Sequence, residues 1–261
     1  MLITLTTDFG DSEYVGAMKG VIRRLNPDVE IIDITHGVRR QSVRHGAYAL
    51  LTAAPHFPPA VHVGVVDPGV GTERRALAIA VEGGYLVGPD NGVLIPAARH
   101  LGVKEVRHAT NMALGLPEVS ATFHGRDVFA PLAAHLAGGI KFRDVGPIAE
   151  RWTDLDFGRA AETPEGLAGQ VIAVDHFGNV ITNVHGAEFM RRFRTGDTLN
   201  LAIGDRTYEV RCVRTYAEGA PNEPVVLVGS GGFLEVAVNR GEAHRTLGVG
   251  EAEAFSLTGR R

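Results

Sequence analysis

The sequence has almost no cysteine and no strong excess of charge of either sign. Cys212 is the single cysteine in 261 residues, which excludes an intramolecular disulfide and a zinc site built of several thiolates. There are 26 Lys and Arg against 30 Asp and Glu, a formal net charge of −4. Nucleic-acid binders and proteins of membrane surfaces usually carry clustered positive charge. We therefore predict neither a nucleic-acid partner nor a membrane partner.

Long apolar runs are also missing. No run approaches the roughly 18 residues of a membrane span, and the start of the chain, Met1 to Asp8, lacks the basic and apolar regions of a signal peptide. Together with the single cysteine, these absences predict a cytoplasmic protein. Hydrophobic residues make up 44% of the chain, which is enough to form a full core without disulfides or structural metals.

Short apolar runs alternate with helix-like stretches through the first half of the chain. Strands are expected at 2–6, 29–34 and 61–66, and helices at 14–25 and 42–54. The first half is completed by a hairpin of 76–81 with 85–87, a strand at 103–107, and helices at 94–100 and 128–136. This order is typical of an α/β layer fold with a mostly parallel sheet.

The second half has a different pattern. A polar stretch at 150–166 has little periodicity and suits a linker. After it, short β-type runs recur between Gly and Asn turns, with one short helix at 187–193, and this pattern is typical of a small β-barrel or sandwich. We therefore predict an α/β amino-terminal domain at 1–160 and a smaller, barrel-like all-β domain at 167–261.

Polar side chains follow three of the expected strands in the first half. Asp8, His36 and Asp67 each come within a residue or two of a strand end, and the carboxyl ends of parallel strands border one crevice where ligands bind. A carboxylate at such an end accepts hydrogen bonds from a vicinal diol such as ribose. The alternative for Asp8 is a helix-capping or turn residue.

Two further motifs in the first half contain acid–base side chains. Pro68 and the glycines around it bend the chain after Asp67, so that Arg74 returns toward the carboxylate. This pattern fits a catalytic pair, a structural ion pair or an anion-binding turn. His124 comes just before a helix that Asp127 is expected to cap. Asp67, Arg74 and His124 together form a candidate acid–base and anion-steering set, although a lone His is more often structural.

Two motifs in the second half suit a nucleoside ligand. Phe177 and Asn179 lie in one turn, where an aromatic face and an amide can hold a purine by stacking and by hydrogen bonds to its edge. Core packing is the alternative for Phe177. The glycine-rich run at 229–241 supplies free N–H groups that can hold a carboxylate, or it forms a plain hairpin turn.

Six motifs occur in an order that resembles one known family. They are Thr6-Thr7-Asp8-Phe9-Gly10, Asp67-Pro68-Gly69-Val70-Gly71, Gly88-Pro89-Asp90-Asn91-Gly92, Phe123-His124-Gly125-Arg126-Asp127, Asp175-His176-Phe177-Gly178-Asn179-Val180-Ile181-Thr182-Asn183 and Gly229-Ser230-Gly231-Gly232-Phe233-Leu234-Glu235-Val236-Ala237-Val238-Asn239. The sequence is similar to the S-adenosyl-L-methionine (SAM) hydrolases, or SAM hydroxide adenosyltransferases, which are related to the fluorinase and chlorinase. The resemblance implies a two-domain homotrimer with sites between subunits. It also implies hydrolysis of SAM to adenosine and L-methionine without a metal or other cofactor.

The resemblance also implies roles for particular residues. The catalytic set is Asp67, Arg74 and His124; Asp8 is the ribose ligand; Phe177, Asn179, Val238 and Asn239 belong to the adenine site; and Asp175, Ser230 and Glu235 contact the methionine or adenosine portion. The halogenases carry a tyrosine in place of Asp67 and a serine in place of Gly125, so the sequence resembles a hydrolase. Two departures concern the pocket: relatives often have prolines and an aromatic residue at 39–41, and the halogenases have a bulkier residue in place of Gly231.

Three alternatives remain open from the sequence. A SAM-dependent halide transferase is disfavoured by Asp67 and Gly125. A metal-dependent phosphohydrolase would use the carboxylate and imidazole groups of Asp8, His36, Asp67 and His124. A non-catalytic SAM or adenosine sensor would use the same pocket for binding alone.

Overall fold

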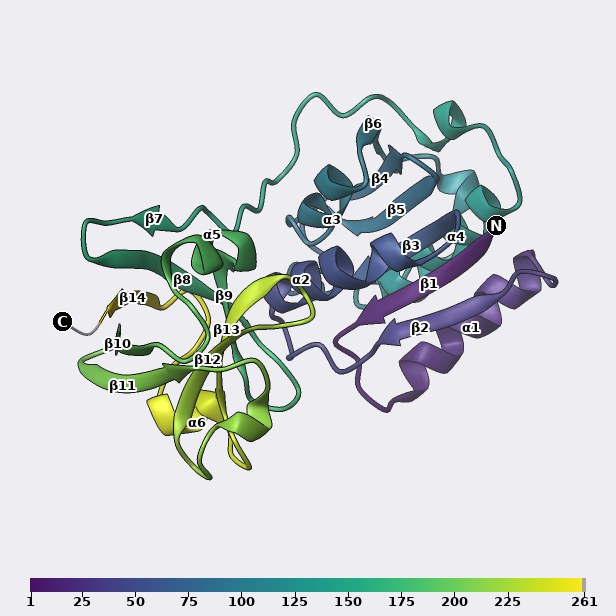
Figure 1. Cartoon of the computed structure of the whole chain (residues 1–261). Helices are drawn as coiled ribbons and strands as arrows, with labels where there is room; N and C mark the ends of the chain where they lie inside the picture. The colour runs from purple at the N-terminus through teal and green to yellow at the C-terminus, as the bar shows by residue number, and fades with distance from the viewer. Residues whose placement is uncertain (260–261) are drawn as a thin grey trace. The chain divides into compact units, whose positions relative to one another are not determined.

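The computed structural model describes residues 1–259. The chain divides into two units, Met1–Asp156 and the part that begins at Phe157, and each has its own sheet and its own core (Figure 1). The boundary lies in an irregular stretch without helix or strand between residues 151 and 160.

A six-stranded sheet forms the centre of the first unit, in the order β2-β1-β3-β5-β4-β6. Its strands are β1 (Leu2–Thr7), β2 (Ile31–Thr35), β3 (Ala60–Val65), β4 (Ala76–Val81), β5 (Gly84–Pro89) and β6 (Val103–His108). The neighbours β2, β1, β3 and β5 run parallel, whereas β4 is antiparallel to both β5 and β6. The predicted hairpin about Gly83-Gly84 is the β4–β5 pair.

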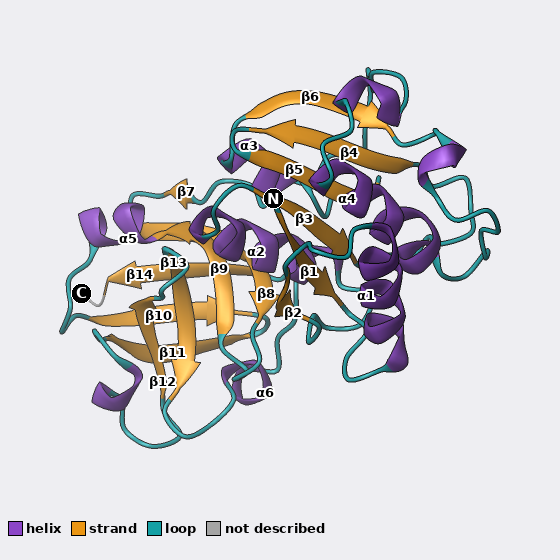
Figure 2. Cartoon of the chain, turned by 90° about the vertical axis from the view of Figure 1, so that its right-hand side faces the viewer, coloured by secondary structure: helices purple, strands orange, loops and turns teal. Residues whose placement is uncertain are grey.

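Helices cover both faces of this sheet (Figure 2). They are α1 (Glu13–Leu25), α2 (Val43–Ala53), α3 (Ile95–His100) and α4 (Ala130–Ala137), with short helical turns at Ala54–His56, Met112–Leu114, Gly125–Phe129 and Phe142–Val145. Helices α1 and α4 pack together on one face, where Ile3, Leu5 and Phe129 are fully buried. Helices α2 and α3 pack on the other face around Leu50. Both faces of the sheet carry apolar side chains, because successive residues of a strand point to opposite sides.

The strand order places a crevice at the end of β1. Strand β1 lies between β2 and β3. The connection from β1 to β2 runs through α1 on one face of the sheet, and the connection from β2 runs back through α2 on the other face to reach β3. In open α/β sheets, ligands bind outside the carboxyl ends of the strands at such a switch point. Residues just after β1, β2 and β3 therefore border one site.

The second unit contains a closed barrel of seven strands and one further short strand, β7 (Ala161–Glu162). The barrel strands are β8 (Gly166–Val174), β9 (Val180–His185), β10 (Thr198–Ile203), β11 (Arg206–Cys212), β12 (Pro224–Val228), β13 (Phe233–Val238) and β14 (Ala254–Gly259). The sheet order is β14-β10-β11-β12-β13-β9-β8-β7, and an additional pairing of β14 with β8 closes the ring and leaves β7 outside it. Leu199, Leu201 and Ile203 alternate inward from β10.

The predicted fold class, an α/β amino-terminal domain followed by a smaller barrel-like domain, is confirmed. The sequence left open whether the second domain is a barrel or a sandwich. It is a barrel, because the pairing of β14 with β8 closes the sheet. The short helix predicted at 187–193 is α5 (Gly186–Arg192), whereas β7, β14 and α6 (Ala243–Leu247) were not predicted. The last two residues of the predicted second domain, 260 and 261, lie outside the described residues.

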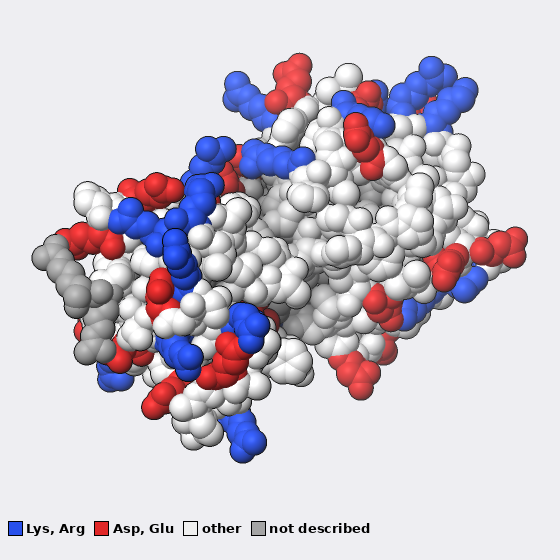
Figure 3. Space-filling model, viewed as in Figure 1, with Lys and Arg blue, Asp and Glu red and all other residues white. Residues whose placement is uncertain are grey.

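On the face drawn in Figure 3, both units carry Lys and Arg as well as Asp and Glu side chains, with large uncharged areas between them. None of the helices between residues 1 and 259 is both long enough and apolar enough to cross a membrane.

Candidate active site

A pocket of about 460 Å³ lies in the first unit at the carboxyl ends of the parallel strands. Asp8 enters it from the end of β1, Gln41 from the segment after β2, and Asp67 from the end of β3. The loop that ends at His124 forms the remaining wall. The expected convergence of strand ends is therefore confirmed for Asp8 and Asp67, and the volume lies within the usual range for small-molecule sites.

A tight loop turns the chain from Asp67 back to Arg74. The N–H of Val70 donates to the Asp67 carbonyl (3.2 Å), and the Thr72 hydroxyl donates to the Gly69 carbonyl (2.7 Å). Gly71 has φ +79, and a Cβ there would lie 2.3 Å from the carbonyl oxygen of Ala121. Only glycine fits this close approach, which holds the loop against the segment that leads to His124.

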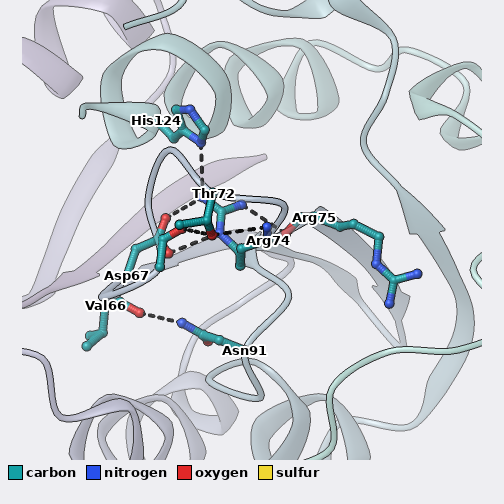
Figure 4. Close-up of polar contacts among 8 residues, drawn as sticks. Val66, Asp67, Thr72, Arg74, Arg75, Asn91 and His124 are labelled. Atoms are coloured by element: carbon teal, nitrogen blue, oxygen red, sulfur yellow. Dashed lines mark hydrogen bonds and ion pairs between the residues drawn. The ribbon is translucent and has the colours of Figure 1, made fainter. Parts of the chain in front are cut away.

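Arg74 links Asp67 to His124 (Figure 4). Its Nε donates to Oδ1 of Asp67 (3.0 Å), one terminal nitrogen donates both to Oδ2 of Asp67 and to Nδ1 of His124 (3.0 Å), and the other donates to the Arg75 carbonyl (2.9 Å). The side chains of Arg74 and Asp67 are only 8% and 7% exposed. A guanidinium has five N–H donors, so Arg74 is almost fully engaged by the protein.

The environment changes the acid–base properties of both partners. Burial raises the pKa of Asp67 above its ordinary value, although the charge of Arg74 opposes this shift. Burial lowers the pKa of His124, and the charge of Arg74 lowers it further. Asp67 is thus a stronger base than an exposed carboxylate, and His124 is neutral near pH 7. Because Nδ1 of His124 accepts from Arg74, the neutral ring carries its proton on Nε2.

His124 lies directly before a helical turn at Gly125–Phe129 that continues into α4. The predicted cap, Asp127, instead lies inside this turn and is fully buried. Its Oδ2 accepts the N–H of Ser120 (2.8 Å), and its carboxylate pairs with Arg126. The prediction of Asp127 as the helix cap is therefore wrong, because the carboxylate ties down the preceding loop rather than the helix end.

Asp8 and His36 have different surroundings. Oδ2 of Asp8 accepts the N–H of Gln41 (2.8 Å) at the pocket wall. His36 does not line the pocket: its Nδ1 lies 2.9 Å from the Thr7 hydroxyl, and its Nε2 lies 3.1 Å from Oδ1 of Asp33. Within residues 1–259, no three His, Cys, Asp or Glu side chains gather closely enough to hold a metal ion.

The residues that the family resemblance assigns to an adenine site lie in the second unit. In the turn from β8 to β9, Oδ1 of Asp175 accepts the N–H groups of Phe177 (2.9 Å) and Asn179 (2.8 Å), and Oδ2 accepts the Asn179 side-chain amide (2.8 Å). The Phe177 ring is 73% exposed, so its alternative as a core residue is wrong. Asp175 therefore fixes a turn that presents an aromatic face to its surroundings.

Strand β13 separates the other candidates of this unit. Val238 ends the strand and Asn239 follows it, whereas Ser230 lies in the exposed turn before its first residue. Six strand residues span roughly 17–20 Å, so Ser230 and Asn239 lie at opposite ends of β13. The structure brings Asn239 to the end of the sheet that carries Phe177, and it does not bring Ser230 there.

Glu235 occupies the middle of β13 and is 4% exposed. Burial raises the pKa of its carboxyl group, a hydrogen bond from the Tyr216 hydroxyl (2.8 Å) opposes this shift, and the charge of Asp175 adds to it. Tyr216 was not predicted as a site residue, because its short helical turn has no motif of its own. Tyr14 was not predicted either; it lines the pocket of the first unit, and its ring lies 4.9 Å from that of Phe123.

The fold and the pocket define a class of enzyme: an α/β domain with a carboxylate, a histidine and a bridging arginine at its strand ends, followed by a β-barrel domain. The model of the SAM hydroxide adenosyltransferase N-terminal domain matches residues 3–146, and that of the C-terminal domain matches residues 169–255. The chain belongs to the SAM hydroxide adenosyltransferase family.

Individual relatives agree with this assignment. The chain is 44% identical to an (R)-S-adenosyl-L-methionine hydrolase of Salinispora tropica, over 98% of this chain and 97% of that protein. A fluorinase of Actinoplanes sp. is 27% identical over 91% of each chain. The solved structure of a conserved protein from Thermotoga maritima, whose function is uncharacterized, superposes with a TM-score of 0.90 at 39% identity, covering 99% of this chain and 100% of that chain.

Proposed function

We propose that this protein hydrolyses SAM to adenosine and L-methionine. The observation that carries the proposal is the bridge from Arg74 to Asp67 and His124, at a pocket that also contains Asp8. It is supported by the full-length similarity to a SAM hydrolase. An aspartate at position 67 and a glycine at position 125 favour water over halide as the nucleophile.

The reaction is a displacement at the 5′ carbon of the ribose. A water oxygen forms a bond to this carbon, the carbon–sulfur bond breaks, and its electron pair stays on sulfur, so methionine leaves as a neutral thioether. One water proton remains to be removed. Because the leaving group needs no proton, the enzyme must only orient the water and accept that proton.

The three site residues have separate tasks in this proposal. The Asp67 carboxylate accepts a hydrogen bond from the water and takes its proton, since burial has raised its pKa. His124 lines the pocket, and its Nε2–H is available to the water oxygen. Arg74 does not line the pocket and instead holds the other two side chains in place. No metal or cofactor is required by these tasks.

Substrate binding involves both units in the proposal. Asp8 binds the ribose diol, and Phe177, Asn179, Val238 and Asn239 bind the adenine. Asp175, Ser230 and Glu235 contact the methionine or adenosine portion. We propose a homotrimer in which the first unit of one subunit meets the second unit of a neighbour. The exposed ring of Phe177 supports this arrangement, because a large apolar ring in a rigid turn gains stability from a covering surface. We also propose a cytoplasmic location, which cell fractionation would test.

The first experiment is incubation of the chelator-treated protein with SAM, followed by chromatography, with Asp67→Ala in parallel. Adenosine and methionine should form in equal amounts with the unchanged protein and at most slowly with the variant. Intact SAM that stays bound would favour a sensor. Activity that returns only with a divalent metal would favour the metal-dependent alternative, and chlorinated adenosine in added chloride would favour a halide transferase.

Mixing two impaired variants at a low SAM concentration tests the proposed assembly. Asp67→Ala removes the base from the first unit, and Phe177→Ala weakens SAM binding by removing the stacking face from the second. If sites form between subunits, co-refolded mixed trimers contain some sites with neither change, and activity rises above the mean of the two separate variants. No gain in activity, or a monomer by light scattering, would contradict the intersubunit site.

A further inference from the structure

The Gly88–Gly92 motif spans the end of β5, and no residue of this motif has a task in the proposed reaction. Strand β5 lies between β3, which ends at Val65, and β4, which begins at Ala76. The segment 66–75, which contains Asp67 and Arg74 and is named the catalytic loop, therefore runs from one side of β5 to the other. Residues just after β5 lie between the two ends of this loop.

Asn91 holds the first end of the catalytic loop (Figure 4). Its Nδ2 donates to the carbonyl of Val66 (2.8 Å), and its Oδ1 accepts the N–H of Val93 (3.2 Å). The register of β3 with its neighbours does not extend past Val65. The peptide that precedes Asp67 is therefore held by a side chain from another strand end, beyond the last pair of the sheet.

The adjacent Asp90 holds the second end of the catalytic loop. Its N–H donates to the Arg75 carbonyl (2.8 Å), which also accepts from the guanidinium of Arg74 (2.9 Å). Its carboxylate pairs with the Arg75 side chain (2.9 Å), accepts the N–H of Thr153 (2.6 Å) and belongs to a side chain that is only 2% exposed. Two neighbouring residues thus fix both ends of a loop that supplies both partners of the Asp67–Arg74 ion pair.

The ion pair depends on the relative position of these two ends. Arg74 binds both carboxylate oxygens of Asp67, and both side chains are buried. A catalytic group that is misplaced by about 1 Å can cost about 100-fold in rate. Neither Asp90 nor Asn91 lines the pocket, so a change in their contacts reaches the reaction through the catalytic loop and not through a contact with SAM.

We propose that Asn91 is a positioning residue for the reaction: it holds the Val66 peptide so that the Asp67 carboxylate stays aligned with Arg74 and with the attacking water. This inference rests on the proposed function, in which Asp67 is the base. Because Asn91 acts through the base, its loss should slow the chemical step and leave the binding of SAM almost unchanged.

Asn111, in the same unit, provides a matched control. Its Nδ2 donates to the carbonyl of Asp144 (2.7 Å), and its Oδ1 accepts the N–H of Ala113 (3.1 Å). Asn91 and Asn111 thus have the same pattern of contacts, a distant carbonyl and the N–H two residues ahead. Asn111 does not line the pocket and makes no contact with the catalytic loop through its side chain.

The test compares the unchanged protein with Asn91→Ala, Asn91→Asp and Asn111→Ala, after thermal melting has shown which are folded at the assay temperature. Asn91→Ala should lower kcat for SAM by about tenfold and keep KM within about twofold. Asn91→Asp keeps the acceptor for Val93 but sets a carboxylate oxygen against the Val66 carbonyl, so its kcat should fall at least as far. Asn111→Ala should lower Tm much as Asn91→Ala does and keep kcat.

Three results would overturn the inference. They are an unchanged kcat in Asn91→Ala, a loss of kcat in Asn111→Ala as large as that in Asn91→Ala, and full activity of Asn91→Asp, which would leave Asn91 only the turn to Val93. Failure of the proposed function gives a different result, because the unchanged protein would then release no adenosine from SAM. A protein that cleaves SAM equally well with and without the Asn91 amide keeps the proposed function and loses this inference alone.

Discussion

Arg74 donates to Nδ1 of His124 across 3.0 Å, while the same guanidinium binds both oxygens of Asp67. One buried side chain thus fixes the orientation of two acid–base groups that come from different segments of the chain. It also fixes which nitrogen of His124 carries the proton. Asp67 and His124 therefore act as a unit through Arg74, not by direct contact.

Removing Arg74 should affect catalysis and both pKa values together. Arg74→Ala should lower kcat by about 100-fold or more, since the base and the imidazole lose their common anchor. The charge of Arg74 lowers the pKa of both Asp67 and His124. Without it, both pKa values should rise, and the acid limb of the pH–rate profile should move to higher pH.

The control for this prediction is Arg99→Ala, which removes an exposed ion pair with Asp154. It should leave the profile unchanged, because exposed pairs contribute little. Titration of His124 by NMR provides a readout that is independent of turnover. An unshifted His124 pKa in Arg74→Ala would contradict the geometry described above.

The exposed ring of Phe177 should matter for binding and not for folding. Phe177→Ala should change the free energy of unfolding by less than about 0.5 kcal/mol, since the ring is 73% exposed. Its affinity for SAM should fall about tenfold, the usual loss when a base loses an aromatic partner. Met190→Ala, another exposed apolar residue of the second unit (46%), is the control and should change neither. Equal affinity of Phe177→Ala and the unchanged protein would remove Phe177 from the adenine site.

A clash should couple Gly229 to Glu235. A Cβ on Gly229 would lie 1.7 Å from Oε1 of Glu235, so Gly229→Ala must displace the buried carboxylate and should cost about 1–3 kcal/mol of stability. In a Glu235→Ala background the obstacle is gone, and the same substitution should cost much less. Denaturant unfolding of the four proteins measures this coupling. Additive costs would show that the two positions are independent.

The stability of the protein should fall in mild acid because of His62. This residue is 4% exposed, its Nδ1 lies 2.8 Å from the Thr4 hydroxyl, and burial lowers its pKa to about 4. In the unfolded chain the His62 imidazole has its ordinary pKa of 6.5, whereas in the folded chain it is protonated only near its lowered pKa of about 4. This contribution is therefore complete above the unfolded pKa and is lost as the pH falls toward the folded pKa.

The expected loss from His62 is about 2 kcal/mol between pH 7 and about pH 4.5. His62→Asn keeps a polar atom near Thr4 but cannot titrate, so its unfolding free energy should depend less on pH by this amount. His56→Gln is the control, because His56 is exposed. If His62→Asn and the unchanged protein lose stability in parallel, another group is responsible.

Features that depend on local periodicity could be predicted from the order of residues alone. The alternation of apolar runs and helices predicted the α/β unit, and the position of Asp8 and Asp67 after parallel strands predicted that they meet at one pocket. These inferences succeed because the side-chain period of a strand or helix, and the meeting of parallel strand ends, are properties of short segments. The loop from Asp67 to Arg74 belongs to the same kind of inference.

Features that depend on contacts between distant segments could not be predicted in this way and are seen only in the folded chain. The pairing of β14 with β8 closes the barrel, and no local pattern specifies a partner strand so far along the chain. His36 follows a strand end as Asp8 does, yet Thr7 and Asp33 hold it away from the pocket. The contact of Arg74 with His124 spans 50 positions. Such contacts are set by packing and strand register, which the spacing of residues does not encode.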